Sequence, residues 1–302
     1  MAFRELYNNL LTTIEKNHMR LDCPMKEYTS FRAGGNAALL IEPGDMAELF
    51  SAAEACRKEH LPMLVMGNGS NLLFRDEGYE GVVVRMGAGI GRIHAEGNVI
   101  FAEAGALLSA VAKEAARHSL SGLEFASGIP GSLGGAVFMN AGAYGGEMKD
   151  VLLSTMALSE NGMMKDRKTA DMKLGYRSSI FQETGEIIIG VKLLLTPGRQ
   201  SEIQEKMREL TAKRNEKQPV SLPSAGSFFK RPEGHFAGKL IEDCGLKGLS
   251  LGGARVSPLH AGFIVNEGDA TAKDILELMR VIQETVYDKT GVRLEPEVRI
   301  VG

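Results

Sequence analysis

The stretch SGIPGSLGGAVFMNAGAYGG, residues 127–146, contains seven glycines, one proline and no charged residue. Each glycine weakens a helix or strand by roughly 0.5–1 kcal/mol relative to alanine, so this many in one segment need a reason. One reason is structural, because tight turns and close backbone packing leave no space for side chains. The other is a flat, phosphate-bearing ligand that lies directly on main-chain N–H groups. The spacing alone leaves both open.

The composition excludes several classes of protein. The 302 residues are 44% apolar and 24% charged with a net charge of −3, which allows two or three globular domains. Acidic and basic residues are interspersed without a basic stripe, so we expect no nucleic-acid partner. No apolar run approaches the ~18–20 residues that span a bilayer, and residues 1–20 resemble an amphipathic helix rather than a signal peptide. We therefore expect a cytoplasmic protein that does not bind membranes.

The cysteines and histidines give no sign of a metal or a disulfide framework. The three cysteines are far apart and form no CxxC pair, and the six histidines show no ligand spacing. This pattern is typical of a protein from a reducing compartment.

Helical and strand patterns alternate along the chain, with strands returning as hairpins, which predicts an α+β fold. Hairpin turns are expected at Glu96-Gly97-Asn98 and at Asn161-Gly162. The expected helices cover residues 46–60, 107–124, 201–219 and 271–291. The expected strands cover residues 61–67, 81–86, 186–198 and 261–266.

Two further glycine clusters follow expected strands. In MGNGSNLLFRDEG (66–78), the glycines permit a tight turn whose bared N–H groups could hold an anion, although an ordinary Asn-rich turn fits equally well. GAGIGR (87–92) is followed by a β-like run instead of the helix that a dinucleotide fingerprint requires, so we expect a plain turn.

Seven motifs in order resemble one known family. They are TSFRAGGNA (29–37), MGNGSNLLFRDEGYEGVVV (66–84), SGIPGSLGGAVFMNAGAYGGEMKDV (127–151), GYRSSIF (175–181), SAGSFFKRPEG (224–234), AGKLIEDCGLKG (237–248) and EPEVRIVG (295–302). Together they are similar to the UDP-N-acetylenolpyruvoylglucosamine reductases, flavoenzymes of peptidoglycan synthesis. The direct run from the arginine motif into the next strand resembles the compact form of the family, which lacks an added tyrosine loop.

The resemblance implies a fold and a division into domains. It implies an α+β chain with a two-part FAD-binding domain of the vanillyl-alcohol-oxidase/p-cresol-methylhydroxylase type and a smaller α+β substrate domain. The expected parts are residues 1–82 with the terminal strand 297–302, residues 83–206, and the substrate domain at 207–296.

The resemblance also implies the reaction. NADPH would reduce non-covalently bound FAD, and UDP-N-acetylglucosamine enolpyruvate would then be reduced to UDP-N-acetylmuramate, by a protein that we expect to be a monomer. The alternatives are an oxidase on the same fold and a non-catalytic sugar-nucleotide binding protein.

Three residues are implied as catalytic. Reduction of an enolpyruvyl ether develops an enolate that must be stabilised and then protonated. By resemblance, Arg177 polarises the substrate carboxylate, Ser227 donates the proton and Glu297 supports the enol. In an extended segment Glu295 shares a face with Glu297, so geometry alone does not choose between them, and the match to the closing motif selects Glu297.

The remaining site predictions concern binding. The expected cofactor residues are Gly67, Asn68, Gly69, Ser70, Asn71, Gly128, Ile129, Pro130, Gly131, Gly134, Gly135, Asn140, Ala141 and Gly142. Lys230, Arg231 and Lys239 are candidate cations for the substrate diphosphate, although each could equally be a solvated charge. For His260 we expect a structural hydrogen bond.

Overall fold

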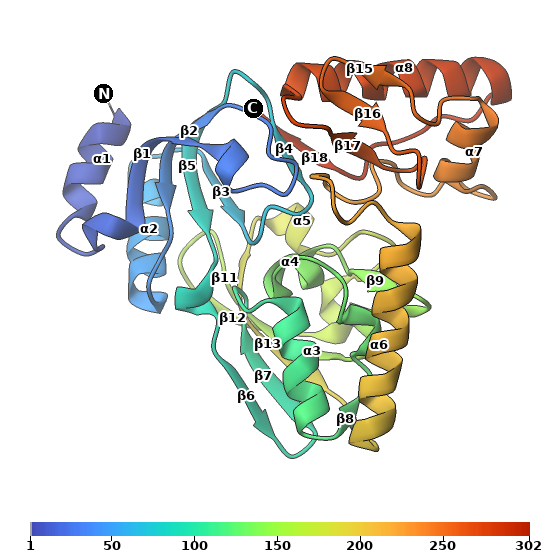
Figure 1. Cartoon of the computed structure of the whole chain (residues 1–302). Helices are drawn as coiled ribbons and strands as arrows, with labels where there is room; N and C mark the ends of the chain where they lie inside the picture. Colours follow the sequence, from blue (N-terminus) through green and yellow to red (C-terminus); the bar gives the residue numbers. More distant parts are fainter. Residues whose placement is uncertain (1) are drawn as a thin grey trace. The chain divides into compact units, whose positions relative to one another are not determined.

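The computed structural model describes residues 2–302 (Figure 1). The chain divides into two units. The larger unit contains the described residues up to Leu21, together with Leu39–Asn68 and Gly81–Arg214, and the smaller unit contains Asp22–Ala38, Gly69–Glu80 and Asn215–Gly302. The predicted boundaries near residues 82 and 206 stay a prediction.

An antiparallel sheet of five strands is the centre of the larger unit (Figure 1). Both predicted hairpins are confirmed, with turns in which Gly97 and Gly162 have φ of +59° and +81°, angles that a side chain disfavours. In sheet order the strands are β12 (Met164–Lys168), β11 (Leu152–Leu158), β13 (Ile187–Leu194), β7 (Val99–Glu103) and β6 (Ile93–Glu96).

A second sheet contains four strands, β1 (Met19–Pro24), β2 (Asn36–Ile41), β5 (Tyr79–Arg85) and β3 (Met63–Met66), in this order. The strands β3 and β5 are parallel. The connection from β2 to β3 contains α2 (Met46–Lys58), which begins where the Asp45 carboxylate accepts a hydrogen bond from the Glu48 amide.

The predicted N-terminal helix is shorter than expected. The helix α1 ends at Leu10 instead of continuing to residue 20. Just beyond its end, the Thr12 hydroxyl donates to the Asn9 carbonyl at 2.9 Å, the kind of local bond by which threonine competes with helical pairing.

The other helices of the larger unit flank its sheet. The helix α3 (Leu108–Arg117) packs on β7, and α4 (Leu133–Phe138) packs on β7 and β13. The short helix α5 (Phe181–Thr184) leads directly into β13. Short strands complete the unit: β8 (Leu120–Ser121) pairs with β14 (Thr196–Pro197), and β9 (Gly142–Ala143) pairs with β10 (Gly146–Glu147). The charged helix predicted at 201–219 is α6 (Gln200–Lys217).

The smaller unit has a core of its own. Its longest helix, α8 (Ala272–Thr290), packs on the antiparallel strands β15 (Ser250–Leu251) and β16 (Ala254–Val256), and β17 (Ile264–Asn266) pairs with β16. The helix α7 (Ala237–Asp243) packs on α8. The C-terminal strand β18 (Arg299–Val301) lies parallel to β4 (Leu72–Phe74).

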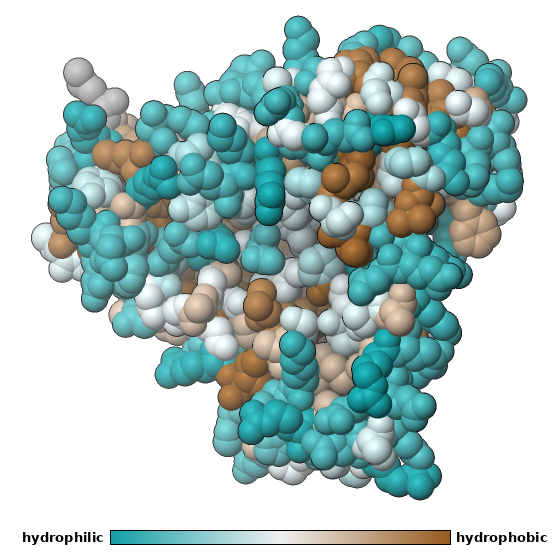
Figure 2. Space-filling view, viewed as in Figure 1, coloured by the Kyte–Doolittle hydropathy of each residue, from teal (hydrophilic) through white to brown (hydrophobic). Residues whose placement is uncertain are grey.

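Figure 2 shows a mostly hydrophilic face, with several hydrophobic residues gathered toward its upper right and a few isolated ones elsewhere. Across residues 2–302, no helix has the length and hydrophobicity needed to span a bilayer.

Candidate active site

The glycine-rich stretch forms a tightly packed helix start. Ser132 caps α4, its hydroxyl accepting from the Gly135 amide at 3.3 Å. The amides of Leu133 and Gly134 donate to the carbonyls of Ala106 and Ala104, each at 2.8 Å. A methyl group on Gly134 would lie 2.8 Å from the Ala104 Cβ, closer than real Cβ atoms approach one another. The structural explanation therefore accounts for Gly134.

The two glycine clusters predicted to bind the cofactor meet in the larger unit. A methyl group on Gly67 would lie 1.9 Å from the Ser132 hydroxyl oxygen and 2.8 Å from its Cβ. The loop after β3 therefore lies directly against the start of α4 at Gly67, the residue before Asn68. Within the smaller unit, the next residue, Gly69, has φ of +63° and its carbonyl accepts from the Ser30 amide at 3.1 Å.

Next to the same stretch lies a cation, Arg214, that no motif in the sequence indicates. The Cδ of Arg214 on α6 would be 3.2 Å from a methyl group on Gly128. The side chain is half-buried, and burial lowers the pKa of its guanidinium. Among residues 2–302, no carboxylate lies within 4.0 Å of this guanidinium. A desolvated cation without a counter-charge is suited to an anionic ligand.

Further glycines of the stretch shape turns. Gly131 has φ of +136°, and its carbonyl accepts from the Leu108 amide at 3.0 Å. The β9–β10 hairpin turns through Tyr144 and Gly145, with φ of +53° and +88°, and a methyl group on Gly142 would lie 2.7 Å from the Gly146 carbonyl oxygen across the hairpin.

The side chain of Asn140 is fully engaged with the protein. Asn140 is 2% exposed, and its amide nitrogen donates to the Glu147 carboxylate at 2.9 Å and to the Gly175 carbonyl at 3.0 Å. Its oxygen accepts from the Lys149 amide at 2.9 Å. Asn140 thus connects the glycine-rich stretch to the turn that carries Arg177.

Arg177 occupies the tip of a two-residue turn in the larger unit. The turn is closed by two backbone hydrogen bonds between Gly175 and Ser178, of 3.1 and 3.3 Å. Arg177 has φ of +53°, a region that residues with a Cβ rarely adopt and that is frequent at functional sites. Its guanidinium lies 5.4 Å from the centre of the Tyr176 ring, and its charge contributes, after the hydrogen bond from Lys149, to lowering the pKa of Glu147.

Ser227 and Glu297 lie on neighbouring segments of the smaller unit. The Glu297 amide donates to the Phe228 carbonyl at 2.8 Å, and Phe229 pairs with Pro296 as an antiparallel bridge. From the other side, the Asn71 side chain donates to the Glu297 carbonyl at 3.1 Å. Main-chain hydrogen bonds therefore hold the segment of Ser227 beside the segment of Glu297, with Asn71 as a further support. The Ser227 hydroxyl itself donates to the Phe229 carbonyl at 3.4 Å.

The structure distinguishes Glu297 from Glu295. The Glu295 side chain is 73% exposed and forms a surface ion pair with Lys230 at 3.3 Å, whereas Glu297 is half-buried. Lys239 likewise pairs with Asp243 at the surface. The Arg231 guanidinium lies 4.6 Å from the centre of the exposed Phe236 ring.

His260 makes the structural bond expected of it. Its Nδ1 accepts from the Gly262 amide at 3.0 Å, and burial lowers the pKa of the imidazole. Both its ring and the Ser227 hydroxyl lie within 3.4 Å of the position that a methyl group on Gly262 would take.

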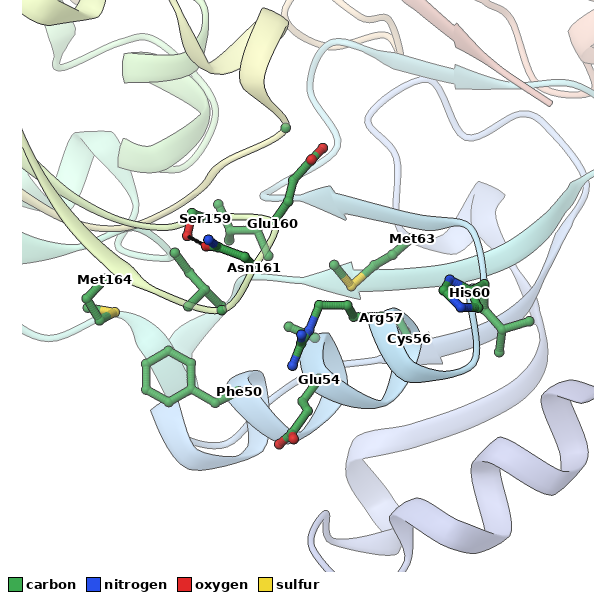
Figure 3. Close-up of a pocket in the computed structure, with 16 residues that line it drawn as sticks. Phe50, Glu54, Cys56, Arg57, His60, Met63, Ser159, Glu160, Asn161 and Met164 are labelled. Atoms are coloured by element: carbon green, nitrogen blue, oxygen red, sulfur yellow. Dashed lines mark hydrogen bonds between the residues drawn. The ribbon is translucent and has the colours of Figure 1, made fainter.

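A cavity of about 700 Å³ in the larger unit contains none of the predicted residues (Figure 3). One wall is the α2 face with Phe50, Glu54 and Arg57, and the opposite wall includes the β11–β12 turn with Ser159 and Asn161.

Comparison with known proteins first defines the class. Residues 37–166 match the family model described as an FAD-binding domain, which confirms a flavin-dependent oxidoreductase of α+β fold. Residues 218–301 match the C-terminal domain of UDP-N-acetylenolpyruvoylglucosamine reductase.

Full-length relatives identify the particular family. The chain is 50% identical to the UDP-N-acetylenolpyruvoylglucosamine reductase of Alkaliphilus oremlandii, with 98% of this chain and 97% of the relative covered. It is 49% identical to that of Caldanaerobacter subterraneus, with 98% of each covered. The crystal structure of the Thermus caldophilus enzyme (MurB) superposes with a TM-score of 0.82 at 39% identity, covering 94% of this chain and 98% of that one. The chain belongs to the UDP-N-acetylenolpyruvoylglucosamine reductase family, as its motifs predict.

Proposed function

We propose that this protein reduces UDP-N-acetylglucosamine enolpyruvate to UDP-N-acetylmuramate with electrons from NADPH, as a cytoplasmic step of peptidoglycan precursor synthesis. Full-length similarity to reductases of this name supports the reaction. We further propose that the protein works as a monomer. Residues 207–296 would bind the substrate, and residues 1–82 and 83–206, together with the terminal strand 297–302, would hold FAD.

The chain offers residues that fit FAD. The loop from Gly67 to Asn71 and the stretch from Gly128 to Gly142 supply main chain without bulk, and a turn of successive N–H groups is suited to phosphate oxygens. Arg214 beside Gly128 adds a cation without a carboxylate partner, which fits a diphosphate. When bound, FAD supplies the hydride transfer between NADPH and the substrate.

The role of the protein is then electrostatic and acid–base. Hydride addition to the terminal carbon of the enolpyruvyl group places negative charge on the adjacent carbon and its carboxylate. We assign Arg177 to this carboxylate, because a planar guanidinium forms two parallel hydrogen bonds with it. Ser227 then gives its hydroxyl proton to the adjacent carbon, and Glu297 supports the enol form.

The observation that carries the assignment of Ser227 and Glu297 is the hydrogen bond between the Phe228 carbonyl and the Glu297 amide. It fixes the two segments in one register, which supports placing both residues at one site, while the exposed Glu295 pairs with Lys230.

The function is tested by anaerobic spectroscopy of the purified protein. NADPH is expected to bleach the flavin absorbance, and the enolpyruvyl substrate is expected to restore it. Recovery only after admission of oxygen would instead show an oxidase. A colourless protein that binds no added FAD would show a non-catalytic binding protein.

A further inference from the structure

One exposed amide holds the turn that carries Arg177. Gln182, on α5, donates from its Nε2 to the Arg177 carbonyl at 3.0 Å and to the Phe138 carbonyl at 2.9 Å. The same nitrogen also lies 3.8 Å from the Met139 sulfur, a weaker acceptor than the two carbonyls. The side chain therefore links the main chain at Arg177 to the last residue of α4.

The Arg177 backbone needs such a restraint. A residue with a Cβ persists at φ of +53° only where its surroundings impose that conformation. The Asn140 side chain and the Ser178 amide both donate to the carbonyl of Gly175, at the entrance of the turn. Gln182 binds the carbonyl of Arg177 itself, and the direction of this carbonyl depends on the Arg177 backbone angles.

We propose that Gln182 is a positioning residue for Arg177: by fixing the Arg177 carbonyl it sets the direction in which the guanidinium leaves the turn. The inference rests on the role proposed above for Arg177 at the substrate carboxylate. Gln182 itself acts only through the main chain of Arg177.

If the role of Gln182 were purely structural, its replacement would mainly lower the stability of the larger unit. The Ser179 hydroxyl also donates to the Phe138 carbonyl, at 2.7 Å, so a second bond attaches this segment to the end of α4 when Gln182 is replaced. The Arg177 carbonyl, in contrast, loses the amide that holds it. Replacement of Gln182 should therefore disturb the orientation of Arg177 more than the stability of the larger unit.

The test compares Gln182→Met, which keeps the length but has no donor, with Gln182→Lys, whose ammonium can donate to both carbonyls. The matched control is Gln204→Met, the same exchange on an exposed position of α6. For each variant the FAD content, the melting temperature, the rate of flavin reduction by NADPH and the rate of anaerobic flavin reoxidation by the enolpyruvyl substrate are measured.

We expect Gln182→Met to slow reoxidation by about tenfold or more, because small errors in the placement of a catalytic group are costly. FAD content, melting temperature and reduction by NADPH should match those of Gln204→Met, and Gln182→Lys should recover most of the lost rate. Reoxidation by Gln182→Met within about twofold of the unmodified protein, or a loss shared equally by all four measurements, would overturn the inference.

Arg177→Lys, measured in parallel, tests the role of Arg177 separately from the positioning role of Gln182. If this variant is slow in reoxidation and Gln182→Met is not, the inference fails and the proposed role of Arg177 stands. If Arg177→Lys reoxidises at the normal rate, the proposed role fails and the inference fails with it.

Discussion

Gly67 and Ser132 provide a quantitative test of how the two glycine clusters pack together. In Gly67→Ala, the new Cβ would lie 1.9 Å from the Ser132 hydroxyl oxygen. Rotation of the hydroxyl would relieve that contact, but it would break the cap to Gly135, which costs about 1 kcal/mol. The Ser132 Cβ would still be only 2.8 Å away, and overpacking of this kind costs about 1–3 kcal/mol. We therefore expect a loss of about 2–4 kcal/mol for the transition of the larger unit.

Ser132→Gly removes both clashing atoms and leaves only the Ser132 Cα, at 3.8 Å. Glycine is itself a tolerated cap, so this variant alone should lose only a few tenths of a kcal/mol. The double variant should then resemble Ser132→Gly, so the coupling should offset the whole loss of Gly67→Ala, about 2–4 kcal/mol. Urea unfolding of the FAD-free protein, followed by circular dichroism, measures all three variants. Additive losses would refute the packing of the two clusters against each other.

Two further predictions concern carboxylates. In a stopped-flow assay, Glu297→Gln should slow flavin reoxidation by the enolpyruvyl substrate by about 100-fold or more. Glu295 is exposed and paired with Lys230 at the surface, so Glu295→Gln should reoxidise within about twofold of the rate of the unmodified protein. Equal effects would remove the distinction between them. Hydrogen bonds from Arg167, and after them from Lys165, lower the pKa of Glu186 from 4.5 to about 2. The ionised Glu186 therefore stabilises the folded state at a pH above the unfolded pKa, and this contribution is lost as the pH falls from about 5 towards 2. Urea unfolding at pH 7 and pH 3 should show that Glu186→Gln loses up to about 3 kcal/mol at pH 7 and much less at pH 3; a loss independent of pH would contradict the ion-pair explanation.

The local signals in the sequence were sufficient for most of the fold. The hairpins were predictable because glycine at a turn adopts a backbone angle that other residues avoid, as at Gly97 and Gly162. The first helix was overestimated because the apolar spacing continues beyond Leu10 while threonine side chains compete for the backbone.

The site was less predictable because its geometry depends on contacts between distant segments. Arg214 was missed because its position on a highly charged helix suggests a solvated residue, and only its burial beside Gly128 distinguishes it. Asn140 is predicted as a cofactor residue, yet its side chain is occupied by protein partners and its main-chain amide donates to the Val137 carbonyl at 3.0 Å. The motif already favours Glu297 over Glu295, but the difference in their exposure is visible only in the structure.

If Ser227 protonates the substrate after hydride transfer, Ser227→Ala should affect the two half-reactions of the flavin differently. We expect anaerobic flavin reduction by NADPH within about twofold of the unmodified protein, and flavin reoxidation by the enolpyruvyl substrate slower by about 100-fold or more. Equal slowing of both half-reactions, or unchanged reoxidation, would contradict the account.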